Sequence, residues 1–389
     1  MNLFYWSPFL SSKVATVRAV LNSAISVSMY SKKLIRPHII NSYGEWSEFK
    51  EEILRNDIGM INFVNNPKNY NALPRYGYIK SRFSYLIIFL NSFYKLFSFL
   101  KLRQNNDYVL IHLISSLPLI LAIFFNFKCK FILRISGYPK MNLFRKFLWR
   151  MANKKLFLVF CPTEDTKTNL SKIGVFDNKK LFVLRDPIIQ FKNITKLKNE
   201  NFNEFDSCEY LLSVGRLTKQ KNHQFLIENF KSILDILPKL KLVILGEGEL
   251  KSDLINRCKK LNIHENIIFK GQVDNVYKYY KNALCFVLSS RWEDPGFVLI
   301  EAASARVPIL SADCPNGPKE FINNDEGGYL YKQNDKVSFI KKLQLLVANK
   351  KNNQEIHRAK VLYAMKKCKN YTNFRHFTNL TKIIINNKI

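Results

Sequence analysis

Two carboxylates that bracket one predicted strand-to-helix junction constrain this chain more than any other feature. Glu293 and Glu301 have seven residues between them. The apolar run that precedes them, residues 283–290, is bounded by polar residues and is typical of a buried parallel strand. We therefore expect Glu293 at the carboxyl end of this strand and Glu301 in the early turns of the following helix. Both would border the crevice in which open α/β sheets bind nucleotides.

Three residues inside this junction have the chemistry of a helix start. Asp294 can cap a helix, Pro295 suits the first helical position, and Gly296 lets a ligand approach the backbone closely. A carboxylate near a helix start is also favoured by the helix dipole in any protein. The carboxylate spacing alone therefore leaves a purely structural role open.

A second strand-loop-helix unit lies upstream, at residues 209–223. It begins with an apolar strand, passes Gly215, which permits a tight turn, and presents Arg216 and Lys221 before a helical stretch. Arginine can fork onto phosphate oxygens, and lysine adds a point charge near the N-terminus of a helix, itself an anion site. Together these residues suit a diphosphate, whereas either cation alone could simply be solvated in a loop.

The alternation of strands and helices continues through the second half of the chain. Apolar strands are predicted at residues 240–245, 267–273 and 307–313, each separated from the next by a helical stretch. Repeated units of this kind imply a doubly wound parallel sheet. The Gly-x-Gly at residues 246–248 does not complete the dinucleotide fingerprint, so no nicotinamide or flavin site is predicted.

Six segments of the second half resemble, in the same order, the signature of family 4 retaining glycosyltransferases. The resemblance implies the GT-B fold, in which two Rossmann-like doubly wound domains face a central cleft, and a nucleotide-activated sugar as the donor. It is strong over residues 206–330 and rests on topology alone in the first half. The segments are 213–217, Lys221, 245–248, 271–273, 293–301 and 313–320.

This resemblance also implies a role for each site residue. Arg216 and Lys221, beside the turn at Gly215, would hold the donor diphosphate. Glu301 would bind the ribose of the nucleotide, and Glu293 would contact the transferred sugar. The backbone at Gly296 and Phe297 would then lie against the sugar and the distal phosphate, which completes the predicted donor site.

The predicted catalytic group consists of Glu293, Arg216 and Lys221. Cleaving the bond between an anomeric carbon and a diphosphate builds negative charge on the leaving group, which paired cations stabilise. Glycosidase chemistry would require a nucleophilic carboxylate beneath the anomeric carbon. The resemblance instead implies that Glu293 orients sugar hydroxyls while the donor phosphate steers the acceptor. We expect neither a metal ion nor a cofactor, because no His/Asp ligand cluster is visible.

The first half predicts a second Rossmann-like domain, at residues 1–190, that binds the acceptor. A linker is expected at 191–206 and the nucleotide-sugar-binding domain at 207–365, with a C-terminal helix at 366–389 returning to the first domain. The first domain should contain a helix over about 13–27 and strands at 1–6, 39–40, 59–64, 108–113, 130–135, 156–160 and 180–184.

The acceptor site is less defined by sequence, because residues 11–13 and 136–137 depart from the glycine and histidine patterns of many relatives. His112, Arg134, Ser136 and Tyr138 lie at or beyond the ends of predicted strands and are candidate contacts for the acceptor or the donor sugar. A hydrogen-bonded histidine in a strand-end network is the alternative for His112.

The net charge of +31 suggests an anionic partner. Residues 83–100 form an apolar, aromatic segment with one charge, Lys95, and basic residues flank it. This segment predicts either a helix packed on the sheet or an interfacial helix in peripheral contact with an anionic membrane. Base-composition bias is another source of the basic charge.

We expect a cytoplasmic protein that is associated with the inner face of the cytoplasmic membrane. The N-terminus lacks the order of a secretory signal, and the seven cysteines show no metal-ligand spacing and suit reduced core positions.

The predicted function is transfer of a hexosyl or N-acetylhexosaminyl group, with a UDP-sugar favoured as donor. The acceptor would be a glycan or lipid-linked glycan in cell-surface polysaccharide or lipopolysaccharide assembly, and the anomeric configuration would be retained. Two alternatives remain open at this point. One is a basic nucleic-acid-binding protein, although no basic stripe with interleaved aromatics is present; the other is a nucleotide-sugar hydrolase or epimerase with the same fold.

Overall fold

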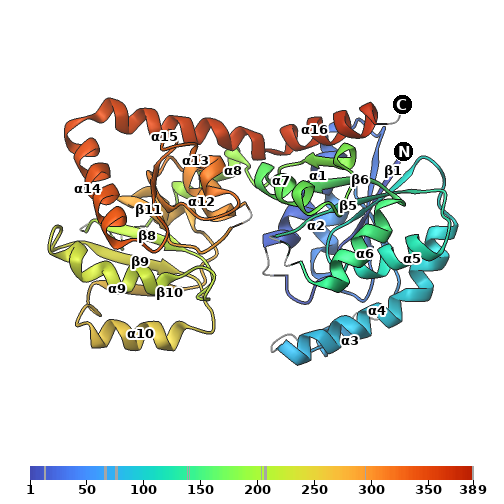
Figure 1. Ribbon diagram of the computed structural model, residues 1–389, viewed down its shortest axis with the longest axis horizontal. Coiled ribbons are helices and arrows are strands. Elements are labelled where there is room, and N and C mark those ends of the chain that lie inside the picture. The colour runs from blue at the N-terminus through green and yellow to red at the C-terminus, as the bar shows by residue number, and fades with distance from the viewer. Residues whose placement is uncertain are drawn as a thin grey trace. The chain divides into compact units, whose positions relative to one another are not determined.

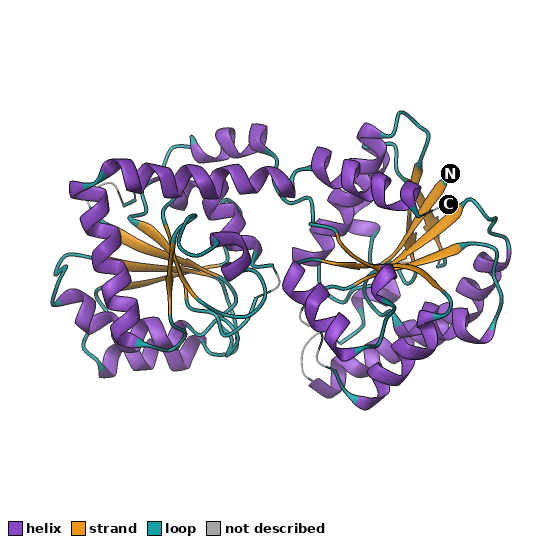
Figure 2. Cartoon of the chain, turned by 45° about the horizontal axis from the view of Figure 1, so that its top comes forward, coloured by secondary structure: helices purple, strands orange, loops and turns teal. Residues whose placement is uncertain are grey.

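The computed structural model describes most of the chain and divides it into two compact units. The described residues are 1–12, 15–64, 68–74, 78–137, 139, 141–202, 204–205, 208–293 and 295–387. The first unit comprises Met1–Ile188 and Tyr371–Ile389, and the second comprises Ile189–Asn370. Each unit is built around its own parallel sheet (Figures 1 and 2).

The sheet of the first unit has seven parallel strands in the order β3-β2-β1-β4-β5-β6-β7. The chain therefore runs outward from β1 in one direction, returns to the other side of β1 at β4, and continues outward. Other elements cover both faces of a parallel sheet, so its strands are apolar at nearly every position. This is why short apolar runs of the sequence form these strands. The strands are β1 (Asn2–Trp6), β2 (Arg36–Asn41), β3 (Gly59–Asn62), β4 (Asp107–Ile111), β5 (Lys130–Arg134), β6 (Leu156–Cys161) and β7 (Leu181–Val183).

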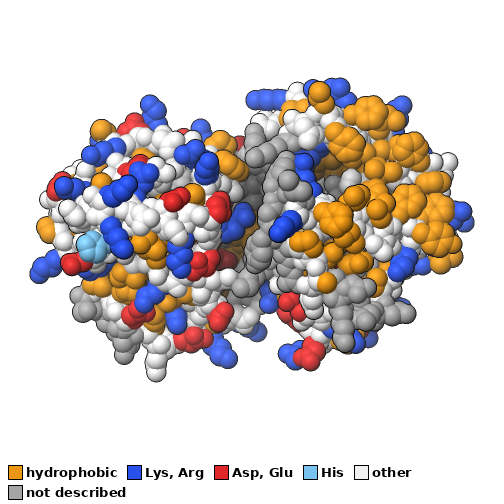
Figure 3. Space-filling view, turned by 90° about the horizontal axis from the view of Figure 1, so that it is seen from below, with side chains coloured by type: hydrophobic (Ala, Val, Ile, Leu, Met, Phe, Trp, Pro, Cys, Tyr) orange, Lys and Arg blue, Asp and Glu red, His pale blue; other side chains and the backbone are white. Residues whose placement is uncertain are grey.

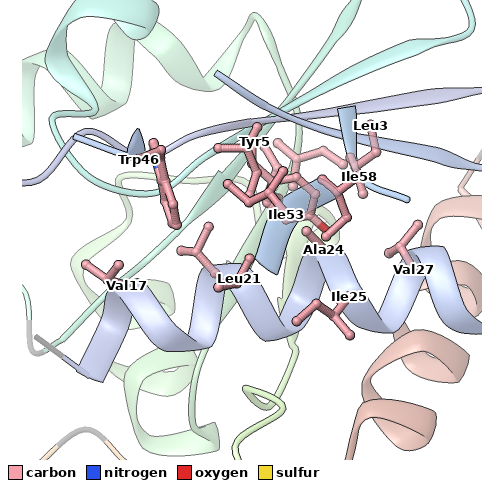
Figure 4. Close-up of a cluster of buried hydrophobic side chains, with 14 of the residues drawn as sticks. Leu3, Tyr5, Val17, Leu21, Ala24, Ile25, Val27, Trp46, Ile53 and Ile58 are labelled. Atoms are coloured by element: carbon pink, nitrogen blue, oxygen red, sulfur yellow. The ribbon is translucent and has the colours of Figure 1, made fainter. Parts of the chain in front are cut away.

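Alternate residues of β1 enter the two hydrophobic cores of this unit. Leu3 and Tyr5 pack with α1 (Ala15–Tyr30) and α16 (Asn373–Asn386), whereas Phe4 and Trp6 pack toward the opposite face. Figure 4 shows α1 lying along the first of these cores. The remaining helical elements are η1 (Ser47–Phe49), α2 (Lys50–Arg55), α3 (Lys68–Asn71), α4 (Tyr78–Lys101), α5 (Ser116–Phe124), α6 (Leu143–Asn153), α7 (Glu164–Ile173) and η2 (Asn178–Lys180).

The C-terminal helix α16 belongs to the first unit through buried hydrogen bonds to α1. The Ser26 hydroxyl donates to the Asn373 carbonyl oxygen at 2.9 Å, and Ser23 Oγ lies 2.7 Å from His376 Nε2. His376 Nδ1 lies 2.7 Å from the carbonyl oxygen of Arg185. The chain end is therefore tied both to α1 and to the segment that follows β7.

The sheet of the second unit has six parallel strands in the order β10-β9-β8-β11-β12-β13. The strand order reverses between β8 and β11, so the topological switch point lies between these two strands. The strands are β8 (Tyr210–Val214), β9 (Lys241–Leu245), β10 (Ile267–Gly271), β11 (Cys285–Leu288), β12 (Ile309–Ala312) and β13 (Tyr329–Tyr331). The predicted doubly wound α/β architecture is confirmed in both units.

Helices cover both faces of this second sheet (Figure 2). Their burial follows the sequence: α9, for example, buries Phe225, Phe230 and Ile233 against β8 and β9 residues such as Leu211 and Leu242. The helical elements are α8 (Phe191–Lys198), α9 (His223–Leu234), α10 (Lys251–Lys260), α11 (Tyr277–Lys281), α12 (Phe297–Ser304), α13 (Pro318–Ile322), α14 (Lys336–Asn352), α15 (Gln354–Cys368) and η3 (Lys369–Tyr371).

The segment expected to be a linker, residues 191–206, instead begins with a helix of the second unit. The α8 helix ends against the body of this unit, where Lys198 Nζ donates to the Ala305 carbonyl oxygen at 2.6 Å. Asn275 Nδ2 donates to the Leu197 carbonyl oxygen at 2.8 Å. The polar composition that suggested a linker is the solvent-facing surface of this helix, and the unit boundary lies at Ile188–Ile189.

Candidate donor-binding site in the second unit

The loops that follow β8 and β11 are hydrogen-bonded to each other at the switch point of the second sheet. The Arg291 amide donates to the Gln220 carbonyl oxygen at 2.8 Å, and the Ser289 hydroxyl donates to the Lys221 carbonyl oxygen at 3.0 Å. Asn222 Nδ2 donates back to the Ser289 carbonyl oxygen at 3.2 Å. The two segments that carry the predicted cations and the predicted catalytic carboxylate therefore form one connected surface.

Lys221 and Glu293 form a largely buried ion pair across this junction. Lys221 Nζ lies 2.5 Å from Glu293 Oε1, and the side chains are 14% and 4% exposed. Ser290 Oγ donates to the same oxygen at 2.5 Å. Among the described residues, none donates a hydrogen bond to Glu293 Oε2. The carboxylate is thus fixed through one oxygen, and the other accepts no hydrogen bond from the described residues.

Arg216 is an exposed cation at the end of β8 and has no ion-pair partner among the residues that the structure describes. It follows Gly215, whose amide donates to the Leu245 carbonyl oxygen at 2.9 Å. A free guanidinium beside a buried lysine is well suited to an anionic ligand, because its forked donors match phosphate oxygens.

Gly246 and Gly248 allow the loop after β9 to pack directly on the loop that carries Arg216. A Cβ atom at Gly246 would lie 2.0 Å from the Gly215 carbonyl oxygen, and one at Gly248 would lie 2.4 Å from the Leu217 carbonyl oxygen. Gly246 also has a φ of 137°, which side chains rarely adopt. These glycines therefore position the cationic loop, which gives the Gly-x-Gly pair a structural role in the site.

The helix that carries Glu301 begins later than the sequence suggested. Gly296 has a φ of 84° and is the N-cap residue, and α12 starts at Phe297. Pro295 therefore precedes the helix and is not in its first position, because the left-handed conformation at Gly296 interrupts the helical path. The predicted capping residue Asp294 lies outside the described residues.

Glu301 lies on α12 and has an unusual proton affinity. Although its side chain keeps some exposed surface, dense protein packing around the carboxyl raises its pKa to about 7, an effect that the positive charge of Lys221 partly offsets. The carboxyl therefore changes its charge near neutral pH.

A third segment, residues 315–317, closes against this junction. The Glu293 amide donates to the Pro315 carbonyl oxygen at 3.1 Å, and a Cβ atom at Gly317 would lie 2.2 Å from the Pro295 carbonyl oxygen. Asn316 is buried with a φ of 59°, and both polar atoms of its amide lack a partner among the described residues. Sequence reasoning missed Asn316 and Ser290, because only the packed loops show that they adjoin Glu293.

The first unit holds a separate pocket at the carboxyl ends of β4 and β5. It has a volume of about 390 Å³ and is lined by His112, Arg134 and Ser136, together with Arg145 and Trp149 of α6. Three of the four candidate acceptor residues thus border one space, whereas Tyr138 lies outside the described residues. Arg145 and Trp149 were not predicted, because a basic-aromatic helix segment gives no sign of the strand ends that it faces.

Buried charge dominates this pocket. Arg134 Nη2 lies 2.7 Å from Asp186 Oδ2, and Arg134 Nη1 has no partner among the described residues. Burial holds the pKa of His112 well below its ordinary value, and the nearby charges of Arg134 and His376 lower it further. His112 is therefore neutral at pH 7, and among the described residues neither ring nitrogen has a hydrogen-bond partner.

Part of the second unit matches a known protein family. Residues 195–361 match the family model described as Glycosyl transferases group 1. The match lies within the second unit. All of the described donor-site residues lie within the matched residues.

Two relatives share sequence with this chain. An uncharacterized glycosyltransferase of Methanocaldococcus jannaschii, MJ1059, is 33% identical over 206 residues, which is 50% of each chain. The Campylobacter jejuni enzyme N-acetylgalactosamine-N,N'-diacetylbacillosaminyl-diphospho-undecaprenol 4-alpha-N-acetylgalactosaminyltransferase is 31% identical over 217 residues, covering 55% of this chain and 58% of that enzyme. The chain therefore spans about half the length of these relatives.

The fold likeness extends over the whole chain. The crystal structure of Alr3699/HepE of Anabaena in complex with UDP matches with a TM-score of 0.74 over 99% of this chain and 100% of that chain, at 12% sequence identity. At this identity the likeness establishes the fold alone. Together with the two parallel-sheet units, it confirms the predicted GT-B fold.

Proposed function

We propose that this protein transfers a sugar from a nucleotide-sugar donor, with a UDP-sugar as the preferred donor, to a glycan or lipid-linked glycan. The anomeric configuration would be retained. The observation that carries this proposal is the Lys221–Glu293 ion pair at the switch point of the second sheet, with Arg216 on the same loop as Lys221 and Glu301 on the helix that follows Glu293. Ligands bind at such switch points in open α/β sheets.

The donor diphosphate would lie on the loop that follows β8. There Arg216 supplies a free guanidinium and Lys221 supplies a second positive charge. As the bond to the anomeric carbon breaks, negative charge grows on the diphosphate, and these two cations stabilise it. Glu301 would accept hydrogen bonds from the ribose hydroxyls in its ionised form.

Glu293 would position the transferred sugar. Lys221 and Ser290 fix its Oε1, so Oε2 can accept a hydrogen bond from a sugar hydroxyl. A carboxylate held this way is a poor nucleophile, because its charge is already compensated. Retention would therefore proceed on one face of the sugar: the acceptor oxygen bonds to the anomeric carbon as the bond to the diphosphate breaks, and a diphosphate oxygen takes the acceptor proton.

One similar structure and one similar sequence support the choice of substrates. Alr3699/HepE was solved with UDP, and the Campylobacter jejuni relative acts on a diphospho-undecaprenol-linked sugar. The pocket lined by His112, Arg134 and Ser136 is the proposed acceptor contact of the first unit. All seven cysteines are free, which fits the proposed reducing, cytoplasmic side of a membrane.

Sugar transfer can be tested by incubating the full chain with UDP-, GDP- and ADP-sugars and a short polyprenyl-diphosphate-linked saccharide. We expect a lengthened lipid-linked glycan with at least one donor, and NMR of the product should show the donor's anomeric configuration. Release of free sugar at the same rate with and without acceptor would instead establish a hydrolase. Tight, salt-sensitive RNA binding without any nucleotide-sugar binding would replace the proposal with a nucleic-acid function.

A further inference from the structure

Helix α4 exposes many large apolar side chains to solvent. Its buried positions recur every four residues, and two of them are serines, whereas six exposed positions are large aromatic or aliphatic residues that stand among exposed Arg82, Asn91 and Lys95. A helix at the surface of a water-soluble protein normally turns its apolar residues to the core and a polar face to water. The buried residues are Ser84, Ile88, Ser92, Leu96 and Leu100, and the exposed residues include Phe83, Leu86, Leu90, Phe93 and Tyr94.

The apolar surface continues from α4 across the end of α5 to α6. Phe97 of α4 contacts Phe125, just after α5, with ring centroids 4.7 Å apart. Phe124 is 75% exposed, and α6 exposes Leu143 to 88% and Phe147 to 65%. Figure 3 shows hydrophobic side chains gathered over this part of the first unit, with lysine and arginine side chains among them. We call this surface, formed by the exposed apolar residues of 83–151, the apolar face.

The exposed large apolar side chains are concentrated on the apolar face and not spread evenly over the chain. Of the 24 large apolar side chains that are exposed among the described residues, 13 lie between Phe83 and Met151. Contiguous apolar surface of this kind marks a binding surface for a membrane or a protein. Single exposed apolar residues elsewhere in the chain need no such explanation.

The charge around the apolar face selects between these partners. Residues 78–163 contain 14 Lys and Arg residues and a single acidic residue, Asp107, which is buried. Lys101, Arg150 and Lys154 are exposed at helix ends beside the apolar residues. Self-association through this face would set cations against cations, whereas apolar residues rimmed by cations match anionic lipid headgroups over acyl chains.

We propose that the apolar face, formed by α4, the end of α5 and α6, docks on an anionic lipid bilayer. Residues Lys80–Lys101 are long and apolar enough to cross a membrane by length and composition. However, α4 contributes Ile88, Leu96 and Leu100 to the cores of the first unit, so it stays attached to the sheet. The inference deepens the lipid-linked acceptor of the proposed function, but it stands on the surface of the first unit alone.

Vesicle flotation tests this proposal with the full chain. Vesicles of phosphatidylcholine alone would be compared with vesicles containing 30% phosphatidylglycerol, at low and high salt. The test variant replaces three exposed residues of the apolar face, Leu90→Ser, Phe144→Ser and Phe147→Ser. A matched control places three serines on exposed apolar residues of the second unit, Val337→Ser, Leu345→Ser and Leu362→Ser. A second variant neutralises Lys101, Arg150 and Lys154 with glutamine.

We expect the unmodified chain and the control to float with the anionic vesicles, and the apolar-face variant to bind them at least roughly tenfold more weakly. The glutamine variant should lose the preference for anionic over neutral vesicles. Failure of the unmodified chain to bind anionic vesicles, or unchanged binding by the apolar-face variant, would overturn the proposal. A dimer in analytical ultracentrifugation that the apolar-face variant dissociates, without vesicle binding, would assign the face to a second copy instead.

A donor-binding measurement keeps this test separate from the proposed function. UDP binding by the apolar-face variant should match that of the unmodified chain, because the substitutions lie in the other unit. Vesicle binding without any sugar transfer would reject the proposed function and leave the docking surface in place. Sugar transfer without vesicle binding would do the reverse.

Discussion

Lys221 Nζ lies 2.5 Å from Glu293 Oε1, which joins the loop after β8 to the loop after β11. The two residues are 72 positions apart in the chain, and they meet because their strands are neighbours in the sheet. In the proposed reaction, one contacts the leaving group and the other contacts the sugar. Their ion pair therefore sets the spacing between the two ends of the donor.

Breaking this pair from one side should destabilise the protein. Lys221→Met leaves Glu293 buried and uncompensated, so the free energy of unfolding should fall by about 3 kcal/mol. Adding Glu293→Gln removes the stranded charge and should recover part of that loss. Urea denaturation of the two single variants and the double variant measures the coupling. Strictly additive losses would show that the pair contributes nothing to stability.

Arg216 should matter for sugar transfer and not for folding. Its guanidinium is exposed and has no ion-pair partner among the described residues, so Arg216→Ala should change the free energy of unfolding by less than about 0.5 kcal/mol. The kcat/KM for sugar transfer should fall roughly 100-fold or more, because a cation at the leaving group is lost. Lys219→Ala, which removes an exposed cation of the same loop, is the matched control and should retain activity. Equal effects of the two substitutions would contradict the assigned role.

Glu301 should make stability depend on pH between about 4.5 and 7. The folded state raises the carboxyl pKa from 4.5 to about 7, so in this range the folded protein holds a proton that the unfolded chain has released. The contribution of this group to stability therefore falls as pH rises through that window. Glu301→Gln should flatten this slope, which thermal unfolding at pH 5 and pH 8 would measure. An unchanged slope in the variant would show that Glu301 titrates normally.

Gly246 and Gly248 should affect donor binding indirectly, through the position of the loop that carries Arg216. Gly246→Ala would force a Cβ atom to within 2.0 Å of the Gly215 carbonyl oxygen, displacing the loop that carries Arg216. We expect UDP affinity to fall at least roughly tenfold in this variant, because the cation moves off the diphosphate. The control is Gly174→Ala, which also replaces a positive-φ glycine but meets no atom within 4 Å. Calorimetric titration with UDP should show normal affinity for the control; normal affinity for both variants would disprove the positioning role.

Much of the fold was predictable because the strands are short apolar runs with polar ends. The sequence also predicted that Arg216 and Lys221 follow one strand, that Glu293 follows another, and that the three residues belong to one site. The contribution of Ser290 was not predictable, since a serine three residues before a glutamate is unremarkable until the loop is folded. The three-residue strand β13 was missed because it is too short to show a period.

The helix α4 shows a different limit of sequence analysis. Its apolar residues cover most of its circumference, so composition alone left a core helix and an interfacial helix open. Only the packing shows that Ser84 and Ser92 face inward while Leu90 and Tyr94 face outward. The late start of α12 has a similar origin, because the left-handed conformation of Gly296 depends on contacts of the folded loop.

Photocrosslinking with an azido-UDP-sugar is the most direct test of the donor site. Mass spectrometry of the labelled full chain should find the label in residues 215–222 or 290–301, and excess UDP should prevent the labelling. Arg216→Ala should reduce the labelling, whereas Lys219→Ala should not. Labelling that is confined to other segments, or that persists in the presence of excess UDP, would contradict a nucleotide-sugar site at the switch point between β8 and β11.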